Sequence, residues 1–164
     1  MVETRQQQIL AVAWHEAGHA LMANILNISK VTATLWMEGG TPRGQTTFDD
    51  YDSRDTALVA AAGVGAGGLY LTRILGKSNL MTDFTNSSVT NYEGGDFWQY
   101  RQKKLTRHLH WVEATEICER HLKRDLNMAR LERISADLVR LGKIDIGTAA
   151  TNHEQQGWWL YGLK

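Results

Sequence analysis

The sequence predicts a mainly α fold with one small β-hairpin. Apolar residues recur at helical spacing over several long stretches, and one short stretch alternates β-branched residues in the manner of a strand. The single proline, Pro42, leaves these stretches free to form uninterrupted helices. The chain has 164 residues, 43% of them hydrophobic and 22% charged, which is an ordinary globular composition. A chain of this length can bury one core without disulfides.

The first half of the chain predicts two helices flanking the hairpin. Thr4 and Gln7 have the spacing of a capping box, and the helix that follows is expected to end near Leu26. Residues 31–37 predict a strand that pairs with residues 45–48 across a turn at 38–44. A second helix is expected over residues 53–75, closed by Gly76. Its apolar run, 57–71, is short for a membrane span and favours a buried helix.

The second half predicts a loop and then helices. Residues 77–95 are rich in Ser, Thr, Asn and Gly, and long loops of this kind are often functional. Residues 96–141 are expected to be helical, with breaks near 108–111 and near Asn127, and Gly142 closes the last helix. The tail from Ile144 ends in an aromatic cluster that we expect to pack on the domain or on another subunit: Trp158, Trp159 and Tyr161.

Composition excludes several classes of function. The 18 basic residues balance the 18 acidic residues, so no net charge attracts nucleic acid or an anionic membrane. Cys118 is the single cysteine, which excludes an internal disulfide and a thiolate-rich zinc site and fits a reducing compartment. We expect Cys118 to be a core residue rather than a nucleophile. Residues 1–8 lack the apolar segment of a signal peptide, so we expect a cytoplasmic protein without a membrane span.

The most informative motif is His15-Glu16-Ala17-Gly18-His19. Residues four apart lie on one face of a helix, so both imidazoles can bind one metal ion. Glu16 is offset from His15 by about 100°, which lets its carboxylate reach a metal-activated water rather than the metal. The alternative is a chance occurrence. Two histidines without a ligand and a glutamate would carry a desolvation cost in so apolar a helix, so the sequence favours a metal site.

The stretch Ala13-Trp14-His15-Glu16-Ala17-Gly18-His19-Ala20-Leu21 resembles the active-site helix of the FtsH family, in the zinc peptidase domain of AAA membrane proteases. Residues 30–34, 44–46 and 57–71 resemble, in the same order, the next strand, its return and a Gly/Ala-rich helix of that family. The resemblance implies a zinc metallopeptidase domain over residues 1–145, followed by a C-terminal tail at 146–164. It also implies a homo-oligomer.

The chain departs from the family in two respects. It lacks the ATPase module and the membrane anchors, and it contains no Gly-x-x-x-x-Gly-Lys-Ser/Thr phosphate loop. Any unfolding of substrates would therefore require a separate ATPase partner. Residues 61–68 also lack the charged Arg and Glu that the family usually carries there.

The third metal ligand has more than one candidate. In the FtsH family it is an aspartate that opens a helix well after the second histidine. Asp96 follows Gly94-Gly95 and opens such a helix, whereas Asp83 lies in the polar loop; His153 remains a further alternative. The sequence favours Asp96, which could also cap its helix. The remaining histidines are expected to be surface or packing residues: His108, His110 and His121.

Together these features predict a zinc metalloendopeptidase that acts on peptides or unfolded proteins. Zinc would be held by His15, His19 and Asp96, with Glu16 as general base. Strand 31–37 is either an edge strand that binds an extended peptide or part of an ordinary hairpin. A non-catalytic zinc-containing module that binds or regulates partners is the alternative function. A hydrolase for small molecules is a third, and would have a deep, narrow pocket.

Overall fold

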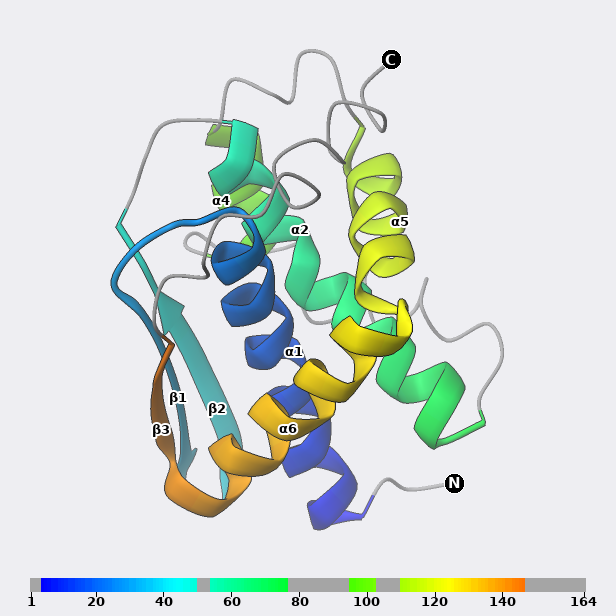
Figure 1. Ribbon diagram of the computed structural model, residues 1–164. Helices are drawn as coiled ribbons and strands as arrows, with labels where there is room; N and C mark the ends of the chain where they lie inside the picture. The colour runs from blue at the N-terminus through cyan, green and yellow to red at the C-terminus, as the bar shows by residue number, and fades with distance from the viewer. Residues whose placement is uncertain (1–3, 50–53, 77–94, 103–109, 147–164) are drawn as a thin grey trace.

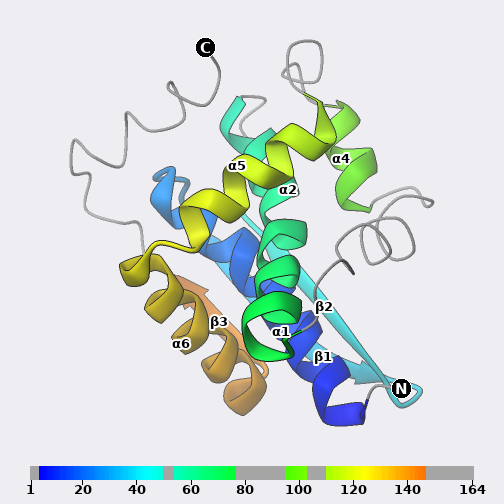
Figure 2. The same ribbon diagram turned by 90° about the vertical axis from the view of Figure 1, so that its right-hand side faces the viewer.

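The computed structural model describes residues 4–49, 54–76, 95–102 and 110–146, and these are mainly helical with a small antiparallel sheet. Figures 1 and 2 show that helix α1 packs against the sheet on one of its sides and against helices α2 and α6 on its other sides. In chain order the elements are α1 (Arg5–Ile25), β1 (Val31–Glu38), β2 (Thr41–Thr47), α2 (Arg54–Leu69), the π-helical turn η1 (Tyr70–Ile74), α4 (Asp96–Gln102), α5 (Trp111–Leu122), α6 (Asp125–Leu141) and β3 (Lys143–Ile146).

Helix α1 is the central helix of the fold. The capping box is confirmed, because the Thr4 hydroxyl accepts from the Gln7 backbone N–H and the Gln7 side chain accepts from the Thr4 backbone N–H. From Ala13 to Ile25 every residue except His15 is buried. Neighbouring elements therefore surround this half of the helix, and the polar side chains that it carries lie in the interior of the protein.

The sheet has the strand order β2-β1-β3, and β1 pairs antiparallel with both neighbours. The predicted hairpin is present, but the predicted turn at 38–44 is too long. Glu38 pairs with Thr41, so Gly39 and Gly40 alone form the turn, both with positive φ (56° and 85°). Two glycines with positive φ suit the twist of a two-residue hairpin, which lets β2 begin earlier than predicted.

Strand β3 was not predicted. It replaces the beginning of the expected tail from Ile144 and pairs Ile146 with Val31. On one side of β1, β3 pairs with residues 31–34, and on the other side β2 pairs with residues 32–38, so the first half of β1 is central in the sheet. Of the two alternatives for strand 31–37, the structure favours a hairpin strand within a sheet over a free edge along this half. Among the described strands, β2 and β3 are the edges of the sheet.

Helix α2 is the predicted second helix, and its last turn is the π-helical η1. Its small residues allow close packing on two sides. A Cβ at Gly18 of α1 would lie 2.4 Å from the Ala66 Cβ, and a Cβ at Gly65 would lie 3.0 Å from the backbone nitrogen of Glu119 in α5. Side chains at these glycines would force the helices apart, so the glycines fix the spacing of α1, α2 and α5.

One described stretch, Thr56–Ile74, is long and apolar enough to cross a membrane by length and composition. In the structure, however, 83% of the tested window is buried against other parts of the chain. A helix that is buried to this extent is typical of the core of a packed domain.

The helices of the second half differ from the prediction at one break. The chain breaks at Lys123 and Arg124, not near Asn127, which lies within α6 and donates its side-chain N–H to the His121 carbonyl at 3.0 Å. Gly142 ends α6 with φ of 74°, as expected. The predicted loop at 77–95, apart from Gly95, lies outside the described residues, as do the first half of the predicted break at 108–111 and the aromatic tail. The same holds for Asp83, His108 and His153.

Candidate metal centre

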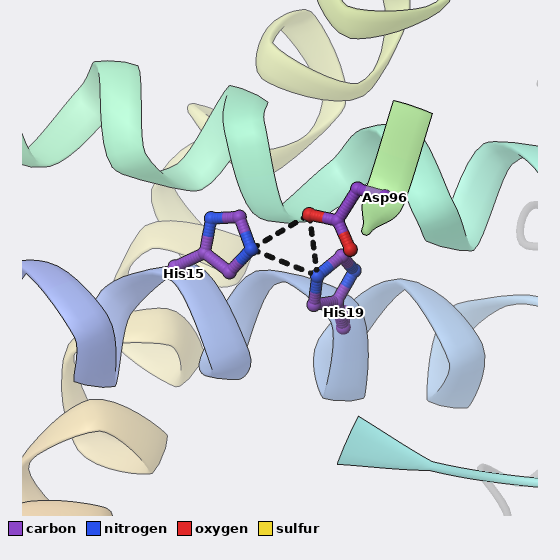
Figure 3. A group of neighbouring side chains, drawn as sticks. All are labelled: His15, His19 and Asp96. Atoms are coloured by element: carbon purple, nitrogen blue, oxygen red, sulfur yellow. Dashed lines mark hydrogen bonds and ion pairs between the residues drawn. The ribbon is translucent and has the colours of Figure 1, made fainter. Parts of the chain in front are cut away.

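His15 and His19 lie one turn apart on α1, on the side that faces α2, and their rings converge (Figure 3). The two Nε2 atoms are 3.1 Å apart, and the ring planes are nearly perpendicular at 87°. His19 is buried, whereas the His15 side chain keeps 17% of its surface exposed. The two nitrogens therefore meet at the border between the core and solvent.

Asp96, the first residue of α4, completes the cluster. Its Oδ2 lies 2.7 Å from Nε2 of His15 and 3.2 Å from Nε2 of His19. The oxygen is buried, yet it has no well-formed hydrogen bond in the described part of the chain. Within the same part, no other His, Cys, Asp or Glu joins this group. The structure thus brings together the two histidines and the aspartate that the sequence favoured as ligands.

The triangle formed by these three atoms has the dimensions of one face of a zinc coordination tetrahedron. With zinc–nitrogen and zinc–oxygen bonds of about 2.0–2.2 Å, tetrahedral ligand atoms lie about 3.3 Å apart. The observed separations are 2.7, 3.1 and 3.2 Å. A circle through the three atoms has a radius of about 1.7 Å, which is shorter than a zinc–ligand bond. A point at bonding distance from all three therefore exists just outside their plane.

The backbone of α2 fixes the protonation pattern of His19. Nδ1 of His19 lies 2.6 Å from the carbonyl oxygen of Val59. A carbonyl can only accept, so Nδ1 carries the proton and donates it, and in the neutral ring the lone pair then lies on Nε2. Metal-ligating histidines commonly donate their second ring nitrogen to a carbonyl in this way. When His19 is neutral, this contact thus selects the tautomer that a metal site requires.

Gly63 of α2 leaves the space into which the imidazoles converge. A Cβ at this position would lie 2.4 Å from Nε2 of His19, 2.5 Å from its Cε1 and 2.8 Å from Nε2 of His15. Atoms do not approach so closely without displacement, so any side chain at residue 63 would push the rings away. Helix α2 orients the site through a carbonyl and a glycine, although it lacks the charged residues that the FtsH family carries in this helix.

The electrostatics of the cluster favour positive charge. Burial by itself would lower the pKa of His19, but the carboxylates of Asp96 and Glu16 and the Val59 carbonyl raise this pKa to about 9. Burial by itself would raise the pKa of Asp96, but the positive charges of His19 and His15 hold it far below its ordinary value. The carboxylates thus stabilise a positive charge at the His19 ring, which is the sign of charge that a metal ion would bring to the same place.

Glu16 follows His15 on α1 and is near enough for its charge to raise the pKa of His19, and strand β2 holds its side chain. Its side chain is buried with 6% exposed. The hydroxyl of Thr46 donates to Oε2 of Glu16 at 2.7 Å. Gly44 packs directly under the carboxylate, where a Cβ would lie 2.4 Å from Cγ of Glu16. The buried acid thus has a defined partner in the neighbouring strand.

The other candidates are separate from this cluster. His110 is exposed at the start of α5, and His121 is half-buried near the end of that helix. Cys118 is fully buried, donates to the Leu58 carbonyl and has its thiol pKa raised by burial, which confirms the prediction of a core residue.

No protein-family model matches this chain, and no curated protein matches its sequence. The geometry of the site and the motif on α1 therefore carry the functional interpretation.

Sequence reasoning missed four residues that shape the site: Gly44, Thr46, Val59 and Gly63. Val59 acts through its backbone carbonyl and Gly63 through the lack of a side chain, so neither gives a motif. Gly44-Gln45-Thr46 did enter the resemblance to the FtsH family, and that match was the available signal for β2.

Proposed function

We propose that this protein is a zinc-dependent metallopeptidase in which His15, His19 and Asp96 hold the metal and Glu16 is the general base. The observation that carries the proposal is the convergence of the three ligand atoms within 3.2 Å of one another, with the buried Glu16 carboxylate beside them. The FtsH-like motif on α1 supports the same function.

The ligand set favours a catalytic site over a closed structural one. Catalytic zinc sites use three protein ligands, whereas structural sites use four. Three ligands are present in the described part of the chain, and His15 and Asp96 each keep 17% of their side-chain surface exposed. Zinc bound there would polarise the substrate carbonyl and lower the pKa of the attacking water.

Glu16 would carry the proton during hydrolysis. Its carboxylate takes a proton from the attacking water as the water oxygen bonds to the peptide carbon. It then gives this proton to the amide nitrogen as the carbon–nitrogen bond breaks. With a metal bound, His19 would carry a single proton, on Nδ1, donated to Val59, and its Nε2 lone pair would be available to the metal.

Strand β2 is the best candidate for peptide binding. It is an edge of the described sheet, and two of its residues contact Glu16. An extended peptide that pairs with this edge would run beside the base, and main-chain pairing of this kind accepts many sequences. We propose peptides or unfolded chains as substrates, with a separate ATPase and a homo-oligomer as the arrangement that the family resemblance implies.

The test compares Glu16→Gln with wild type on an unstructured fluorogenic peptide. The variant should bind one equivalent of zinc, because no ligand is changed, and should lose at least about 100-fold in kcat. Glu132→Gln, an exposed change on α6, is the matched control and should retain activity. Wild-type hydrolysis by Glu16→Gln would refute the mechanism. A zinc-loaded wild-type protein that cleaves no peptide would favour the alternative, a non-catalytic zinc-containing module.

A further inference from the structure

The two oxygens of the Glu16 carboxylate have different surroundings. Oε2 accepts the hydrogen bond from Thr46 at 2.7 Å, and the same hydroxyl lies 3.2 Å from the Glu16 backbone carbonyl. The shorter bond, to a charged group, is the stronger. Oε1 bonds none of the described residues and lies over Gly44, where a Cβ would come within 2.7 Å of it. One oxygen is therefore held, and the other lies over a glycine.

Strand β2 supplies both features from one face. Gly44 and Thr46 are two residues apart, so both project from the face of the strand that packs on α1. The strand is fixed in register, since Gly44 pairs with Leu35 and Thr46 pairs with Ala33 of β1. The hairpin thus places the open space at Gly44 and the hydroxyl of Thr46 next to the carboxylate of Glu16, a residue of α1.

A glutamate side chain has several rotatable bonds, and α1 alone does not decide where the carboxylate lies. The hydroxyl of Thr46 removes that freedom by binding Oε2. Gly44 removes the obstacle that any other residue would place at Oε1. A base that must reach a single water benefits from such orientation, because a misplacement of about 1 Å can cost on the order of 100-fold in rate.

We propose that Thr46 is a positioning residue for Glu16: its hydroxyl holds Oε2 so that Oε1 is the oxygen that exchanges the proton, with Gly44 providing the space. This proposal rests on the proposed function for its consequence in catalysis. The positioning itself is a property of the chain and can be measured in the metal-free protein.

The kinetic test uses Thr46→Val, which keeps the branched shape of the side chain and removes the hydroxyl. We expect kcat to fall about 10- to 100-fold while KM stays within roughly twofold, because the change affects the base and not the peptide contacts. Thr46→Ser restores the hydroxyl and should recover most of the rate. Thr34→Val removes a hydroxyl bond to the Gln45 carbonyl in the same hairpin and should leave kcat unchanged.

A second comparison places Thr46→Val in the Glu16→Gln background. If Thr46 acts through Glu16, the double variant should be no slower than Glu16→Gln alone. A further loss in the double variant, or a Thr46→Val enzyme at the wild-type rate, would overturn the proposal.

The third readout does not depend on activity. In the metal-free protein with ¹³C-labelled glutamate, Thr46→Val should shift and broaden the Glu16 carboxylate signal, and Thr34→Val should leave it in place. Zinc affinity, measured against a chromophoric chelator, should stay within roughly threefold of wild type in both. An unchanged carboxylate signal would overturn the positioning role even if Glu16 proves essential. If Glu16→Gln retains activity, the proposed function fails, and the carboxylate signal still decides whether Thr46 orients Glu16.

Discussion

Gly63→Ala is the most informative single change, because it disturbs the metal centre without altering a ligand. The added Cβ would lie 2.4 Å from Nε2 of His19, about 1 Å inside ordinary contact distance. The helices cannot separate easily to relieve this overlap. A Cβ at Gly18 would already lie 2.4 Å from the Ala66 Cβ, so α1 and α2 are in direct contact one turn away. The imidazole must move instead.

The expected magnitudes follow from this geometry. Overpacking costs about 1–3 kcal/mol, and replacing glycine by alanine in a helix recovers about 1 kcal/mol, so the metal-free variant should lose no more than about 2 kcal/mol of stability. Zinc binding requires Nε2 of His19 in its place. We expect the dissociation constant for zinc to rise at least about 100-fold, equivalent to about 2.7 kcal/mol. The assay is competition for zinc with a chromophoric chelator, paired with thermal unfolding of the metal-free protein.

Gly65→Ala is the matched control. It lies on the same helix, and its Cβ would meet the backbone of α5 at 3.0–3.2 Å, away from the histidines. This variant should lose stability to a similar degree and keep its zinc affinity. If Gly63→Ala folds and binds zinc as tightly as wild type, the ligand cluster between α1 and α2 is refuted.

Two further predictions concern stability. Zinc at about 100 times its dissociation constant should stabilise the protein by about 2.7 kcal/mol, so a chelator should lower the Tm of the zinc-loaded protein. Asp96→Asn should abolish this change in Tm. An equal change in the variant would exclude Asp96 as a ligand. Burial lowers the pKa of His121 to about 4, with Arg124 and Arg120 acting in the same direction. The unfolded chain, with a pKa of about 6.5, then binds more protons between pH 6.5 and 4, so His121 makes stability fall as the pH drops through this window. Chemical denaturation of His121→Gln should give a shallower fall, and equal slopes would contradict this reasoning.

The central helix could be predicted because its signals are local. The capping box of Thr4 and Gln7, the apolar spacing and the His15–His19 pair all lie within a few turns of one helix. Asp96 could be favoured only through the family resemblance, since nothing in the spacing between residues 19 and 96 indicates contact. The structure places it against both histidines.

The remaining parts escaped prediction for physical reasons. Strand β3 has four residues, and only pairing with β1 makes it a strand. The dipeptide Gly39-Gly40 suits positive φ and indicates a two-residue turn, whereas the predicted turn covered residues 38–44. Val59 and Gly63 shape the site through a carbonyl and an absent side chain, which become visible only once α2 is packed on α1.

The central claim is that one zinc ion binds His15, His19 and Asp96 with a position left open for water. The most direct test is a crystal structure of the zinc-loaded protein with anomalous data collected at the zinc edge. We predict a single zinc peak bonded to Nε2 of both histidines and to a carboxylate oxygen of Asp96, with a non-protein oxygen as the fourth ligand. A peak elsewhere, or a fourth ligand from the protein that closes the site, would contradict this account.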